Sequence, residues 1–148
     1  MRHLLWEAGF WVLASFVLLG VGCLFHFVLV PAVAPGLRKE YENRALFRDL
    51  DGWPWTYMIL HPLLYGVLFA GVFRLGGCVE RIETWWQGIL MGACFGLVVF
   101  LIGSLPVYLL NYASFAVSSH VIQAWVVQSL CQYVFAGAAL GLYSVWAS

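Results

Sequence analysis

An unbroken stretch of 65 residues, from Thr84 to Ser148, carries no formal charge. Across the whole chain 64% of the residues are hydrophobic and only 9% are charged, whereas a soluble domain has about 25% charged residues. A chain of 148 residues is too short to bury so much apolar surface in a soluble core. The surplus must face lipid, and we predict an all-α integral membrane protein.

Charge-free runs long enough to cross a bilayer core of about 30 Å predict four transmembrane helices. The first run lies between Glu7 and Pro31, and the second ends before Arg74. The long charge-free stretch suits two further spans, separated near Pro106 and the polar residues 111–120. These spans predict a single transmembrane domain over residues 1–148, an up-down bundle with spans at about 8–30, 55–73, 85–109 and 121–145.

The first apolar run also has features of a secretory signal peptide. Arg2 precedes it, and the residues 32–34 (Ala-Val-Ala) imitate a cleavage site. The run is longer than an ordinary signal-peptide core of about 7–15 residues, and Pro35 would obstruct cleavage directly before it. We therefore interpret the run as a retained transmembrane helix.

Residues 36–52 form the only substantial hydrophilic stretch. Opposite charges four residues apart, such as Arg38 and Glu42, would support a helix. Leu37 and Tyr41 could lie on one apolar stripe of that helix. The pattern predicts a short amphipathic connector at the membrane surface, and a solvated charged loop is the alternative.

Basic residues near the ends of the spans predict the orientation. Arg74 and Arg81 flank the second connection, whereas the third connection has no basic residue. We therefore expect both termini in the cytoplasm and the charged first connection outside.

Small residues recur at four-residue spacing in the last two predicted spans. Rows of this kind let helix backbones approach closely in lipid. They predict helix packing at Gly88, Gly92, Gly96, Gly137 and Gly141. Amide side chains inside a span are costly unless they are paired. We expect interhelical hydrogen bonds, or alternatively a polar substrate path, at the intramembrane residues Gln128, Gln132 and Asn111.

His26 and His61 are predicted near the same end of two adjacent antiparallel spans. Histidine commonly binds metals, haem and related pigments, so this pair is the candidate cofactor site. Structural or interfacial histidines are the favoured interpretation, because no closely spaced His-His or Glu-His ligand motif accompanies them. We predict no metal site, and we interpret His120 as interfacial. The chain also lacks nucleophile, phosphate-binding and metalloprotease motifs, so we expect no catalytic residue and no enzyme.

Three stretches resemble a group of small four-helix bacterial membrane proteins that have no assigned function. They are QGILMGACFGL, LPVYLLNYASF and AGAALGLYS, at residues 87–97, 105–115 and 136–144. The resemblance implies a multi-pass protein of a bacterial inner membrane. Its shared motifs are packing motifs, so it implies no catalytic residue.

Two functions fit these features. The first is a non-catalytic structural or accessory subunit of a larger membrane complex, with other membrane subunits or further copies of itself as partners. The alternative is a small transport or cofactor-binding protein that uses His26 and His61 to hold haem, a chlorophyll-type pigment or a metal. The formal net charge is zero, so no basic surplus suggests a nucleic-acid partner.

Overall fold

The computed structural model describes residues 2–41, 53–77, 80, 82–114 and 117–147, and every regular element in them is helical. Two five-residue segments, denoted η, are π-helical. The elements in chain order are α1 (Arg2–Leu24), η1 (Phe25–Leu29), α2 (Val30–Val33), α3 (Pro35–Tyr41), α4 (Trp53–Leu75), α5 (Trp85–Val99), η3 (Phe100–Ser104), α6 (Leu105–Ser114) and α7 (Ser119–Ala147). The predicted all-α class is confirmed for these residues.

Three helices are long and apolar enough to cross a membrane. They cover Trp6–Val33, Trp85–Ser114 and Ser119–Trp146. The first combines α1, η1 and α2, and the second combines α5, η3 and α6. The remaining long helix, α4, has a shorter apolar stretch at Ile59–Leu75.

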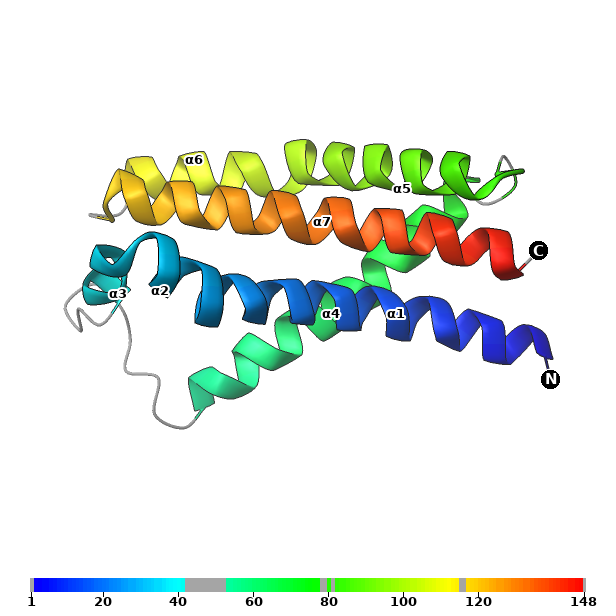
Figure 1. The fold of residues 1–148 in the computed structure, drawn as a ribbon, viewed down its shortest axis with the longest axis horizontal. Coiled ribbons are helices and arrows are strands. Elements are labelled where there is room, and N and C mark those ends of the chain that lie inside the picture. Colours follow the sequence, from blue (N-terminus) through cyan, green and yellow to red (C-terminus); the bar gives the residue numbers. More distant parts are fainter. Residues whose placement is uncertain (1, 42–52, 78–79, 81, 115–116, 148) are drawn as a thin grey trace.

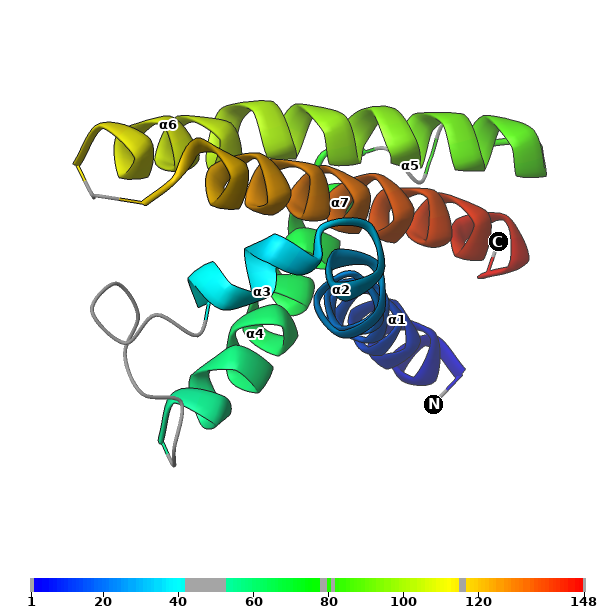
Figure 2. The ribbon, with the colours of Figure 1, turned by 60° about the vertical axis from the view of Figure 1, so that its left-hand side comes forward.

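The helices alternate in direction, so the molecule has two distinct ends. The α5–α6 helix and α7 lie side by side, α1 lies against α7, and α4 crosses α1 obliquely (Figure 1). In a turned view, α1 and α4 diverge at an angle from beneath α7 (Figure 2). Both termini and the start of α5 lie at one end, which we call the terminus end. The segment α3 and the start of α7 lie at the other, which we call the loop end.

The apolar core runs along the contacts of α1 with α4 and α7. Its buried side chains include Phe10, Ala14, Leu18, Phe69, Phe73, Phe100, Ala136 and Leu140. A smaller cluster at the loop end joins Val30, Leu37 and Val121. The predicted connector is helical at α3, where Leu37 is buried and Lys39 is exposed. The rest of the connector, residues 42–52, lies outside the described residues.

Each π-helical segment ends two residues before a proline, Pro31 or Pro106. Proline has no N–H group, and its ring meets the carbonyl four residues earlier. That carbonyl belongs to Phe27 in η1 and to Ile102 in η3. A wider π turn accommodates the ring, so both helices continue through their prolines. The break is predicted at Pro106 and the polar residues 111–120; the helix continues through Pro106 and ends at Ser114, within that polar stretch.

Candidate functional site

The helices α5 and α7 approach so closely that their backbones touch. A Cβ atom on Gly92 would overlap the carbonyl oxygen of Gly137, and one on Gly88 would overlap that of Gly141. Gly96 lies in the same way against the backbone of Tyr133. The five glycines predicted for helix packing thus lie in one α5–α7 interface, where the absence of side chains permits close backbone packing.

A second close approach fixes the crossing of α1 and α4. A Cβ atom on Gly66 would overlap the backbone and side chain of Ser15. The Ser15 hydroxyl donates a hydrogen bond of 2.9 Å to the Leu63 carbonyl. Sequence reasoning did not identify Ser15, because a single serine in an apolar run gives no information about its partner helix.

Gln128 and Gln132 of α7 face α1. The Gln132 side-chain amide donates a hydrogen bond of 2.7 Å to the Leu18 carbonyl. The Gln128 amide nitrogen lies 3.5 Å from the position that a Cβ atom on Gly22 would occupy. Because Gly22 has no side chain, the amides of Gln128 and Gln132 have room beside α1. Asn111 lies elsewhere, half-buried in α6.

His26 and His61 have different neighbours. The His26 ring meets an adjacent phenylalanine ring edge-on, whereas His61 stacks on Tyr65 with 5.6 Å between ring centroids. The helices α1 and α4 cross where Gly66 meets Ser15. His26 lies eleven residues beyond that crossing and His61 five residues from it. The two histidines are thus offset by about 9 Å along the helices.

Polar groups from three helix segments meet beside η3. The Ser104 hydroxyl of η3 donates a hydrogen bond of 3.0 Å to the Tyr133 hydroxyl oxygen of α7. The rings of Tyr65 and Tyr133 lie 5.4 Å apart, and the Tyr65 hydroxyl lies 3.5 Å from where a Cβ atom on Gly103 would be. With the stacked His61, these five residues form what we call the tyrosine cluster. Of these residues, the sequence analysis selected only the histidine as a candidate ligand.

The π turn of η3 directs Ser104 toward α7. Every fourth residue from Gly88 onward faces α7, first the glycines, then buried Phe100, then Ser104, and then Tyr108, which shares a hydrogen bond with Ser129. In a straight α-helix each four-residue step would drift by about 40°. The wider π turn has more residues per turn, so it offsets this drift and turns the fourth residues toward α7 again. The π turn that accommodates Pro106 therefore directs the Ser104 side chain toward α7.

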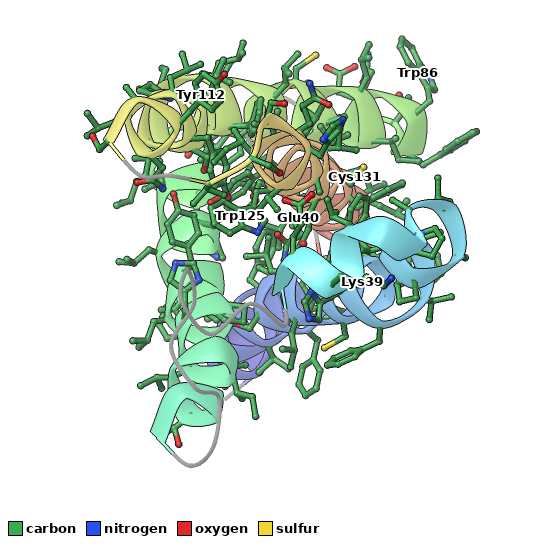
Figure 3. All side chains as sticks on the ribbon, turned by 90° about the vertical axis from the view of Figure 1, so that its left-hand side faces the viewer. Lys39, Glu40, Trp86, Tyr112, Trp125 and Cys131 are labelled. Atoms are coloured by element: carbon green, nitrogen blue, oxygen red, sulfur yellow. The ribbon has the colours of Figure 1, made fainter. Side chains whose placement is uncertain are left out.

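The connector is tied to the start of α7. The Ser118 hydroxyl donates to the Glu40 carboxylate, and its oxygen accepts a hydrogen bond of 3.3 Å from the Val121 N–H. Ser118 thereby caps α7, and the positive end of the helix dipole favours a nearby carboxylate. Figure 3 shows Glu40 directed toward this end of α7, near Trp125. The buried Leu37 adds an apolar anchor.

The terminus end has its own ties between helices. Glu7 of α1 forms an ion pair with Arg74, close to the end of α4. The Tyr143 hydroxyl of α7 donates a hydrogen bond of 3.4 Å to the Trp6 carbonyl. Both α4 and α7 are therefore joined to the start of α1 by polar contacts.

The described part of the chain brings together no group of three or more His, Cys, Asp or Glu side chains that could hold a metal ion. Comparisons with protein-family models, with curated proteins and with solved structures find no match. We therefore infer the function from the contacts described above.

Proposed function

We propose that this chain is a four-span integral membrane protein that serves as a non-catalytic accessory subunit of a larger membrane complex. The direction in which the chain runs supports α4 as the fourth span. If the three long helices cross the bilayer, α4 must return the chain from the loop end to the start of α5 at the terminus end. The Glu7–Arg74 pair supports this course. With 23 residues, α4 is about 35 Å long, which suits a tilted span of a core of about 30 Å.

The proposal of a non-catalytic role rests on one observation: polar side chains inside the helices form hydrogen bonds to neighbouring helices. Ser15 and Gln132 bond to backbone carbonyls of neighbouring helices. Ser104 and Ser129 bond to tyrosine hydroxyls across the α7 interface. Bonds of this kind hold helices together in lipid. These groups therefore serve assembly of the bundle and do not line a reaction site.

The outward face of α4 is the surface that we propose for a partner. Because α4 packs mainly on α1, it presents a stripe of exposed aliphatic side chains at about four-residue spacing. They are Leu60, Leu64, Leu68, Val72 and Leu75. Residues four apart share one helix face, so the stripe could receive a single helix from another subunit or from a second copy.

We further propose a bacterial inner membrane as the location, with both termini cytoplasmic. Exposed Arg74 lies at the terminus end, whereas the sequence between α6 and α7 has no basic residue. Basic residues near span ends favour the cytoplasmic side.

Native mass measurement in mild detergent tests the accessory role. We expect protein solubilised from its host membrane to run in an assembly clearly larger than its own 16.6 kDa. Changing both Leu64 and Leu68 to tryptophan should reduce retention of the partner at least tenfold, because the larger rings disturb the α4 stripe. Leu110→Trp, at an equally exposed position on α6, is the matched control and should retain the partner. A wild-type protein that runs alone at every mild detergent concentration would contradict the role.

A further inference from the structure

His61 is exposed on α4, and its ring stacks on Tyr65. Within the described residues its ring nitrogens have no hydrogen-bond partner. His61 lies three residues, about 4.5 Å, from Leu64 at the middle of this 23-residue helix. If α4 spans the bilayer as proposed above, the imidazole lies in the hydrocarbon region, where an unpaired polar group is costly. The outward face of α4 therefore requires a partner with hydrogen-bonding groups, which lipid chains lack.

The opposite face of α4 is already occupied by the bundle. Gly66 lies against the backbone of Ser15 in α1. Phe69 and Phe73 both meet the ring of Phe95 in α5, with 5.0 and 5.1 Å between ring centroids. A further partner of α4 can therefore bind only on the face that points away from these contacts.

Five residues on that outward face are spaced alternately by three and four positions. They are His61, Leu64, Leu68, Gly71 and Leu75, which we call the outer seam. Four of them are exposed, and a Cβ atom on Gly71 would meet nothing within 4 Å. At 100° per residue the outer seam lies about 180° from the buried face.

The spacing of the outer seam indicates the geometry of the partner. Alternating steps of three and four are those of the a and d positions of a heptad, through which two parallel helices pack side by side. Most helices in membrane bundles cross at the same angle of about 20°. The outer seam thus suits one helix that runs nearly parallel to α4.

We propose that a second copy of this chain covers the outer seam, in a two-fold dimer of parallel α4 helices. The dimer rests on the membrane role proposed above and identifies the partner. Two copies inserted in the same orientation bring each seam position against its own counterpart. A neutral imidazole has one donor nitrogen and one acceptor nitrogen, so His61 and His61 of the second copy can hydrogen-bond to each other. One polar pair at an a position also fixes the register of two helices.

The charges of α4 permit two identical surfaces to meet. Like charges that face each other across an interface disfavour association. The outer seam carries no formal charge. The neighbouring Arg74 is paired with Glu7 of its own chain. A second copy therefore brings no unpaired like charge to this face.

Disulfide cross-linking in native membranes tests the dimer, with single cysteines placed in a full-length chain that lacks its native cysteines. We expect Leu64→Cys and Leu68→Cys to give a product of twice the 16.6 kDa chain mass on mild oxidation, because like seam positions face each other. Leu110→Cys on α6 is the matched control, since Leu110 is 65% exposed and Leu68 is 66% exposed. It should give no such product.

Energy transfer between labelled copies in phosphatidylcholine vesicles tests the histidine pair. His61→Leu should raise the dissociation constant of the dimer about fivefold, because one hydrogen bond between helices is lost. His61→Asn should dissociate much as the wild type does, since an amide also offers a donor and an acceptor. His120→Leu is the matched control at an exposed histidine on α7, and its dissociation constant should be unchanged.

The dimer is overturned if the seam cysteines cross-link no more than Leu110→Cys does. It is also overturned if His61→Leu associates as tightly as the wild type, because the imidazoles then do not meet. If the seam cysteines give no dimer but the native assembly still exceeds the mass of one chain, a different protein is the partner and only the dimer fails. A chain that gives no cross-link and also runs alone in mild detergent loses the proposed accessory role as well.

Discussion

Replacing Gly92 with alanine is expected to lower the free energy of unfolding by about 2–3 kcal/mol. A Cβ atom at this position would overlap the carbonyl oxygen of Gly137, and the clash is with backbone rather than with the end of a flexible side chain. The helices α5 and α7 must therefore separate to admit the methyl group. The loss should appear although alanine is the better helix former by about 1 kcal/mol.

Gly20→Ala is the matched control for this substitution. A Cβ atom on Gly20 meets nothing within 4 Å, so we expect unchanged or slightly greater stability. Unfolding in mixed micelles with rising dodecyl sulfate, followed by helical circular dichroism, gives both values. The Gly92→Ala/Gly137→Ala double variant should cost less than the two single changes together, because both disturb one contact. Equal midpoints for Gly92→Ala and Gly20→Ala would show that the α5–α7 contact is looser than described.

Gly66→Ala is expected to weaken the crossing of α1 and α4 by about 2 kcal/mol. The added methyl group would overlap the backbone of Ser15 and would disturb the hydrogen bond from Ser15 to the Leu63 carbonyl. Because α4 packs mainly on α1, the damage should be local. We expect faster amide hydrogen exchange along α4, with little change in the α5–α7 pair.

Gly71→Ala, five residues further along the same helix, is the matched control, since a Cβ atom there meets nothing within 4 Å. Its exchange pattern should equal that of the wild type. If Gly66→Ala instead speeds exchange equally in α4, α5 and α7, the crossing is not a separate unit and α4 is held by the whole bundle.

The helices were predictable because the decisive signal is local. A charge-free run of about 20 residues forms a helix in lipid whatever it packs against, and the glycine row from Gly88 to Gly96 indicates close packing in the same direct way. The helix ends were less predictable. Pro106 is normally a breaker, and nothing in the neighbouring residues reveals that a π turn carries the helix on to Ser114.

The candidate site was harder to predict because it depends on the register between helices. Tyr65, Ser104 and Tyr133 are separated by tens of residues and lie in apolar runs where none of them stands out. They meet only because Gly66 sets where α4 crosses α1 and η3 sets where Ser104 points. The position of the crossing at Gly66 also offsets His61 from His26, although the sequence analysis placed both near the same end of adjacent spans.

The side of the membrane reached by the α4–α5 connection tests the four-span bundle most directly. In a variant without its native cysteines, single cysteines at Ala45, Gly76, Ser119 and Ser148 would be labelled from one face with a membrane-impermeant maleimide. We predict that Ala45→Cys and Ser119→Cys react from one face, and that Gly76→Cys and Ser148→Cys react only from the other. Labelling of Gly76→Cys from the same face as Ala45→Cys would show that α4 does not cross the membrane and would contradict the bundle proposed here.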